Sequence, residues 1–118
     1  MSFDFNGNTP IYLQIIERIK LQIIKKELLP GQKLPSVRDY SLQFSVNPNT
    51  VQKSLSQLEN DGLIFTERTN GKFVTLNQEI INKEAECTIE QKLNEFCSYM
   101  AELGVDKGEI IKKLNEKE

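Results

Sequence analysis

The chain of 118 residues contains no histidine and only two cysteines, Cys87 and Cys97. Without histidine the familiar Cys/His zinc sites cannot be assembled, and the commonest general base of enzymes is missing. The sequence also has no phosphate-cradling glycine loop, nucleophile-elbow serine or paired-carboxylate signature. We therefore expect no metal and no cofactor, and we predict that the protein is not an enzyme, although Asp, Glu and Lys chemistry stays open. The cysteines are interpreted as small apolar residues near a helix face, with a redox switch as the alternative.

Long apolar runs are absent as well, so the sequence predicts no transmembrane helix and no membrane partner. The first residues, MSFDFNGN, lack the basic and then apolar segments of a secretory signal. Both observations favour a cytoplasmic protein. The length suits one compact domain, or a small domain with an accessory element.

Charge is unevenly distributed along the chain, whose formal net charge is −2. Residues 9–77 hold nine Lys/Arg and six Asp/Glu, a net charge of +3, whereas residues 78–118 hold six and ten, a net charge of −4. The acidity is therefore concentrated in the C-terminal part. The overall charge is a poor guide to what the N-terminal part could bind.

Three helices are predicted in the N-terminal part. Thr9-Pro10 is typical of a helix start, with threonine as the cap, and the helix should run for about five turns to near Leu28. Its apolar stripe is Tyr12, Ile15, Ile16, Ile19 and Ile23.

Ser36 and Asp39 have the spacing of a capping box for a short second helix, with Val37, Tyr40 and Phe44 facing inward. Asn47-Pro48 then opens a third helix that ends at Asp61-Gly62, with inward residues Val51, Leu55 and Leu58.

A β-hairpin is predicted next, from two alternating, β-prone segments at residues 63–68 and 72–76. Thr69-Asn70-Gly71 lies between them, and we expect Asn-Gly to supply the positive φ angles of a tight turn. Arg68 and Lys72 should flank the hairpin tip.

The C-terminal part is predicted to be helical. Apolar residues recur there at spacings of four, three, four and three, which is a heptad-like seam on a single helix face: Ile89, Leu93, Phe96, Met100 and Leu103. Gly104 should end that helix, and Asp106 with Glu109 should cap a last short one that carries Ile110, Ile111 and Leu114. A helical hairpin over residues 78–118 is implied.

The order helix, helix, turn, helix, hairpin is that of a winged helix-turn-helix. The run LPGQKLPSVRDYSLQFSVNPNTVQKSLSQLENDGLIFTERTNGKFV resembles the DNA-binding domain of GntR-type bacterial transcription regulators, approximately LPSxRxLAxxLxVxxxTVxxALxxLxxxGLIxxRxGxGxFV. The resemblance covers about residues 9–76, and the short length with a two-helix tail is similar to the YtrA-type branch. The expected fold is mainly α with a small β-hairpin (α+β), with a winged helix at residues 9–76 and a dimerisation region at residues 78–118.

The third helix is the predicted reader of DNA, because a major groove admits one helix with its N-terminal residues nearest the bases. The side opposite its apolar stripe carries Pro48, Asn49, Thr50, Gln52 and Lys53. Amides can pair with base edges, and a hydroxyl or a lysine can reach a base or a phosphate. The alternative is a plain solvated helix face.

The second helix and the hairpin should add contacts to the phosphate backbone. The resemblance implies such a contact for Arg38, for which a local pair with Asp39 is the alternative, and Ser36 is primarily a cap beside a phosphate-accepting helix end. The hairpin resembles the family's wing, which approaches the minor groove, with candidate contacts at Arg68, Thr69, Asn70, Gly71 and Lys72. Thr69 replaces the first wing glycine of the family pattern.

The resemblance also indicates a homodimer on a palindromic double-stranded operator. Its predicted interface is Ile89, Leu93, Phe96, Met100, Leu103, Ile110 and Leu114, with packing on the chain's own N-terminal part as the alternative. The family-level expectation is a repressor of a transporter operon. About forty residues after the wing are too few for a separate effector domain, so a small-molecule effector is left open and not indicated. The competing function is a winged-helix protein-interaction adaptor that binds no DNA.

Overall fold

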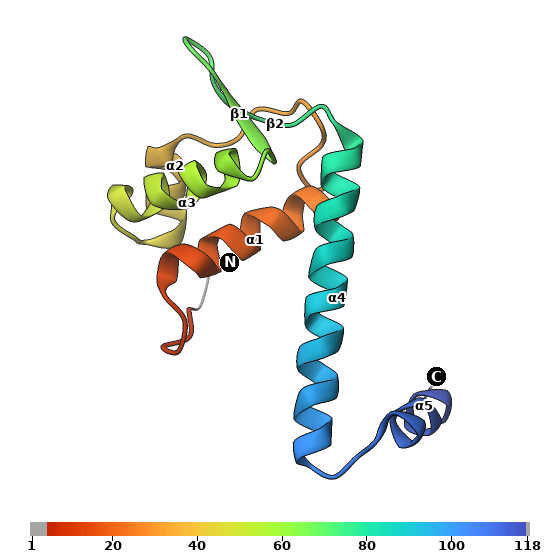
Figure 1. Cartoon of the computed structure of the whole chain (residues 1–118). Helices are drawn as coiled ribbons and strands as arrows, with labels where there is room; N and C mark the ends of the chain where they lie inside the picture. Colours follow the sequence, from red (N-terminus) through yellow and green to blue (C-terminus); the bar gives the residue numbers. More distant parts are fainter. Residues whose placement is uncertain (1–4, 118) are drawn as a thin grey trace. The chain divides into compact units, whose positions relative to one another are not determined.

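Helices and one antiparallel hairpin make up the structure, a computed structural model that describes residues 5–117 (Figure 1). The elements follow in the order α1 (Ile11–Ile24), α2 (Val37–Phe44), α3 (Pro48–Asn60), β1 (Ile64–Glu67), β2 (Gly71–Val74), α4 (Gln78–Glu102) and α5 (Lys107–Asn115). The mainly α fold with a small hairpin, predicted from the sequence, is confirmed. The chain divides into two compact units, one ending at Asn82 and the other beginning at Lys83.

The core of the N-terminal unit lies where α3 packs against α1, α2 and β1. The apolar stripes predicted for the three helices supply it, because helical spacing of three and four places their side chains on one face. Four isoleucines of α1, Tyr40 and Phe44 of α2, and the three inward residues of α3 are all buried. Ile81, in the first turns of α4, belongs to the same core.

The first helix differs from its prediction at both ends. Pro10 occupies the N-cap position with no side-chain cap, and the Thr9 carbonyl instead accepts a 2.7 Å hydrogen bond from the side-chain Nε2 of Gln14. The predicted threonine cap is wrong because Thr9 lies one residue too early. The helix also ends at Ile24, since Lys26 adopts a left-handed backbone (φ 65°) that turns Leu28 back into the core.

Local capping side chains determine where α2 and α3 begin. The Ser36 hydroxyl accepts from the Asp39 amide at 3.0 Å, and the Asp39 carboxylate accepts from the Ser36 amide at 3.2 Å, which confirms the capping box. At α3 the Asn47 side chain accepts from the Asn49 amide at 2.7 Å, with proline at the first position. Both starts follow their predictions.

The hairpin pairs Ile64 with Val74 and Glu67 with Gly71, so its turn consists of residues 68–70. The prediction that Asn70 and Gly71 both adopt positive φ is wrong. Gly71 alone does so at the tip (φ 106°), as expected of a three-residue turn followed by a left-handed residue. The strands are also shorter than the predicted segments at 63–68 and 72–76.

The segment before α2 forms an isolated β-bridge along the edge of β2. Lys33 forms an antiparallel bridge with Phe73, and the Leu34 amide donates to the Lys72 carbonyl at 2.8 Å. The segment leading into α2 is thereby attached to the hairpin.

In the C-terminal unit, α4 and α5 are joined by a short connection around Gly104. Gly104 has a φ of 80°, and the Val105 amide donates to the Met100 carbonyl at 2.9 Å, a hydrogen bond that ends a helix in a left-handed turn. The Asp106 side chain then accepts from the Glu109 amide at 2.9 Å and caps α5. Gly104 as the stop and Asp106 as the cap were both predicted.

Candidate nucleic-acid interface

The N-terminal half of α3 presents an exposed polar surface. Because its apolar stripe is fully buried, the opposite side chains must point away from the core, and Pro48, Asn49, Gln52 and Lys53 are exposed. Thr50 is half-buried. Four of the five predicted contact residues on this helix are therefore accessible from solvent, and the fifth partly so.

Lys53 has an aromatic neighbour that sequence reasoning did not identify. Its ammonium lies 3.9 Å from the centre of the Tyr12 ring on α1, which is a cation–π contact. One residue further, the buried Ser54 hydroxyl donates to the Tyr12 carbonyl at 2.8 Å. These two contacts attach the reading face of α3 to the first turn of α1 and restrict where the lysine can point.

The start of α2 contributes one free cation. Arg38 is exposed and has no ion-pair partner among residues 5–117. The Asp39 carboxylate accepts from the Ser36 amide instead. The alternative of a local Arg38–Asp39 pair is therefore not observed, and the Ser36 hydroxyl is already engaged as a cap.

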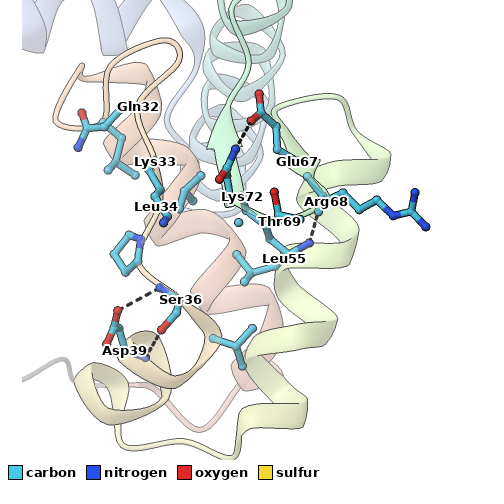
Figure 2. A pocket seen from close by; sticks show the side chains of 16 residues that line it. Gln32, Lys33, Leu34, Ser36, Asp39, Leu55, Glu67, Arg68, Thr69 and Lys72 are labelled. Atoms are coloured by element: carbon cyan, nitrogen blue, oxygen red, sulfur yellow. Dashed lines mark hydrogen bonds between the residues drawn. The ribbon is translucent and has the colours of Figure 1, made fainter.

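A cleft of about 810 Å³ separates the start of α2 from the hairpin (Figure 2). We call it the hairpin cleft, and its rim carries Lys33, Ser36, Asp39 and residues 66–72. In Figure 2 the Arg68 side chain extends away from the other labelled residues. Arg68 and Thr69 are exposed, and the Asn70 side chain donates to the Glu67 carboxylate at 3.1 Å.

Lys72 was predicted to contact DNA from its place beside the hairpin tip, but its side chain does not extend freely from the hairpin. Its ammonium forms a 3.0 Å ion pair with Glu59 of α3 and donates to the Thr66 hydroxyl at 2.8 Å. Thr66 in turn donates to Glu59 at 2.7 Å. The Thr66 hydrogen bond, followed by that of Lys72, holds the pKa of Glu59 below its usual value.

Gly71 and Lys33 form a second arrangement that the sequence did not reveal. A Cβ on Gly71 would lie 3.2 Å from the Lys33 Cε, so the missing side chain leaves room for the lysine stem across the hairpin. Lys33 is exposed and has no ion-pair partner in the part of the chain that the structure describes. The sequence offered no signal for this arrangement, because a single β-bridge is too short to show a periodic pattern.

The C-terminal unit exposes a second candidate surface, which is apolar. Four of the five seam residues lie on α4, and Leu103 directly follows its end. All of them are exposed except Met100, which is half-buried, and Leu114 of α5 is exposed. Ile110 is already buried within the single chain. Tyr99 and Ile111, which were not among the predicted interface residues, add to the exposed apolar surface.

Other kinds of site find no support within residues 5–117. That range contains no group of three or more Cys, Asp or Glu side chains placed to hold a metal ion. Both cysteines are exposed on α4 and are not bonded to each other. Nor does any of the described helices combine the length and the apolarity needed to cross a membrane.

The fold and this surface define a winged helix-turn-helix protein, in which a capped helix presents polar groups beside a cationic hairpin. Residues 11–74 match the family described as "Bacterial regulatory proteins, gntR family". The chain belongs to the gntR family and is a transcription regulator with a DNA-binding domain. Its resemblance to the YtrA-type branch, predicted from the sequence, is confirmed, as is the prediction that it is not an enzyme.

Two relatives from Bacillus subtilis are similar over nearly the whole chain. The uncharacterized HTH-type transcriptional regulator YhcF is 40% identical over 111 residues, which cover 94% of this chain and 92% of YhcF. The HTH-type transcriptional repressor YtrA is 35% identical over 117 residues, covering 98% of this chain and 87% of YtrA.

Solved structures of gntR-type regulators are also similar to this chain. A GntR family transcriptional regulator from Listeria monocytogenes superposes with a TM-score of 0.89 at 33% identity, covering 97% of this chain and all of that one. The AraR DNA-binding domain in complex with operator ORX1 has a TM-score of 0.59 at 29% identity, over 64% of this chain and 99% of that domain.

Proposed function

We propose that this regulator is a homodimeric repressor that binds a palindromic operator in the cytoplasm. Its DNA-binding domain comprises residues 9–76, and residues 78–118 hold the two protomers together. The observation that carries the proposal is the exposed and mostly uncharged face of α3, where Asn49, Gln52 and Lys53 can reach base edges in a major groove. The operator seen with the AraR domain supports the same use of the fold here.

Phosphate attraction would come from residues around that face. Arg38 and Arg68 are exposed cations without an ion-pair partner among residues 5–117, as phosphate contacts should be. Thr69, Asn70 and Gly71 would bring the hairpin tip to the adjacent minor groove. A protein-interaction adaptor has no need for cations on both sides of a polar helix, and this observation favours DNA over the adaptor function.

Dimerisation is the proposed role of the apolar surface on α4 and α5. Phe96 and the leucines of the seam would lose solvent exposure against a second copy, and large exposed apolar patches are typical of interaction sites. Two-fold symmetry of the dimer would then require two related half-sites in the operator. Since YtrA-type relatives are expected to repress transport genes, we extend the proposal to a transporter operon.

A titration with labelled DNA tests this function. Fluorescence anisotropy should be measured on a duplex from upstream of the protein's own gene and on a scrambled duplex, at two salt concentrations. We expect tighter binding to the upstream duplex and weaker binding to both at higher salt, because phosphate contacts release counterions. Equal binding to the scrambled duplex, or no binding at low salt, would contradict sequence-specific DNA binding.

Lys53→Ala probes the reading face within the same titration. Binding to the upstream duplex should weaken severalfold, since a lysine contact to a base or phosphate is lost. Removing the contact with Tyr12 should cost no more than about 1 kcal/mol of unfolding free energy. Loss of binding together with a much larger loss of stability would instead mean that Lys53 is a structural residue.

A further inference from the structure

Three side chains join the hairpin to the last turns of α3, and we call them the α3–hairpin cluster: Glu59, Thr66 and Lys72. Thr66 and Lys72 are cross-strand partners, and each hydrogen-bonds to the same Glu59 oxygen, at 2.7 and 3.0 Å. A further hydrogen bond of 2.8 Å joins Lys72 to Thr66. The cluster is closed, because Thr66 donates to the carboxylate and accepts from the ammonium.

This closed arrangement leaves Lys72 poorly suited to bind phosphate. Its side chain is 20% exposed, and two of its three N–H donors already have partners. To reach DNA it would have to break hydrogen bonds to a charged group, which are stronger than neutral ones. It would also leave the Glu59 carboxylate unpaired close to the phosphates, where like charges repel.

Lys33 has the properties that Lys72 lacks. It is exposed, lines the hairpin cleft as Arg68 does, and has no ion-pair partner within residues 5–117. Its bridge to Phe73 and its stem across Gly71 hold it on the hairpin although it precedes α2 in the sequence. A lysine held in this way presents a flexible ammonium at the rim of the cleft.

We propose that Lys72 is a positioning residue that fixes the hairpin to α3 through Glu59, and that Lys33, with Arg68, supplies the hairpin's phosphate-contacting charge. The inference rests on the proposed DNA binding and deepens it. Gly71 has a matching role, since its missing side chain leaves space for the stem of Lys33.

Salt dependence distinguishes the two lysines. Each phosphate contact to a duplex adds about 0.9 to the slope of log affinity against log salt concentration. In the full-length protein, Lys33→Gln removes one contact from each protomer of the proposed dimer. It should therefore lower the slope on the upstream duplex by about 1.8 and weaken low-salt binding severalfold. The double variant Glu59→Gln/Lys72→Gln, which keeps the net charge, should leave the slope unchanged. Lys113→Gln, in α5, controls for the loss of one charge.

A second measurement needs no variant and so does not depend on how the variants fold. Lysines of the wild-type protein are acetylated with and without the upstream duplex, and the modified sites are identified by mass spectrometry. Lys33 should react in the free protein and be protected by DNA. Lys72 should react slowly in both states because Glu59 and Thr66 already bind its ammonium.

Several outcomes overturn the inference while the proposed function survives. One is that Lys33→Gln binds the upstream duplex with the same salt slope as the wild type. Another is that the double variant has a lowered salt slope. The third is that Lys72 is acetylated readily in the free protein and is protected by DNA. If the wild-type protein does not prefer the upstream duplex at all, the proposed function itself fails.

Discussion

At the scale of single residues, Tyr40 has an unusual environment. Its ring is buried and stacks on Phe44 at a centroid distance of 5.5 Å, but its hydroxyl is buried without a hydrogen-bond partner among residues 5–117. Burial also raises the pKa of Tyr40, since the phenolate would lose its hydration. A phenol with these properties costs stability.

Replacing that hydroxyl should therefore be favourable. We expect Tyr40→Phe to raise the free energy of unfolding by about 1 kcal/mol, because the ring contacts remain and an unsatisfied polar group is removed. Above about pH 10 the wild type should lose stability, because the tyrosine ionises in the unfolded chain and stays protonated in the folded one. Tyr40→Phe should lose less stability over the same pH range. Urea denaturation at neutral and alkaline pH measures both effects. A clear loss of stability at neutral pH would show that the hydroxyl has a partner.

Residues with local partners could be predicted from the sequence, and those with distant partners could not. Ser36 and Asp39 cap a helix within three residues of each other, so their spacing alone identifies them. The Glu59–Lys72 pair spans 13 residues and needs the finished fold to bring its partners together. The same holds for Lys53 and Tyr12, on two different helices.

At the scale of secondary-structure elements, the end of α1 carries backbone strain. Lys26 has a φ of 65°, a left-handed conformation that costs a residue with a side chain about 1–2 kcal/mol. Lys26 lies directly after the helix end, and the next residue, Glu27, donates from its amide to the Gln22 carbonyl at 2.8 Å. Glycine is the usual residue at the left-handed position of such a helix end. The sequence predicted a longer helix because lysine gives no stop signal.

Lys26→Gly should relieve this strain. We expect the variant to be more stable by about 0.5–1 kcal/mol, since the glycine's extra freedom in the unfolded chain offsets part of the gain. The neighbouring Lys25→Gly is the matched control, because Lys25 has an ordinary helical φ of −78° and should be destabilised by glycine. Thermal unfolding of the two variants gives the comparison. A destabilised Lys26→Gly would mean that the lysine side chain contributes more than its strain costs.

The junction of α3 and the hairpin should depend on pH. The pKa of Glu59 is lower in the folded protein, so its stabilising contribution is complete above the unfolded pKa of about 4.3 and is lost as the pH falls through the folded value. Solvent screening limits the effect to below about 1 kcal/mol, since the Glu59 side chain is 40% exposed. Glu59→Gln should therefore lose less stability than the wild type between about pH 6 and about pH 3.

Urea midpoints across that pH range measure the difference. Glu86→Gln is the matched control, since the Glu86 side chain is exposed on α4 and has no hydrogen bond or ion pair in the described part of the chain. Identical pH profiles for the wild type and Glu59→Gln would argue against a stabilising pair at this junction.

At the scale of the whole molecule, the proposed dimer depends on the apolar seam of the C-terminal unit. Phe96→Glu places a charge in that seam, and it should give a monomer that binds the upstream duplex far more weakly, because one half-site replaces two. Asn94→Glu adds the same charge on the same exposed helix outside the seam and should remain dimeric. Size-exclusion chromatography with light scattering measures the mass. A monomeric wild-type protein would contradict the dimer.

Fold and family could be predicted from the sequence, because caps, stripes and turn residues act locally and occur in the order of a winged helix. Ile81 shows where such reasoning ends. It lies in the first turns of α4, yet its side chain is buried in the N-terminal core, which the boundary expected near residue 78 does not anticipate. Helical periodicity identifies a buried face and carries no information on which unit buries it.

A hydroxyl-radical footprint of the full-length protein on its upstream DNA tests the central claim most directly, since it reports binding, symmetry and spacing together. We predict two protected segments related by a two-fold axis, with centres about 10 base pairs or a multiple of that distance apart. A single protected segment, or uniform protection along the duplex, would contradict a homodimer that reads a palindromic operator.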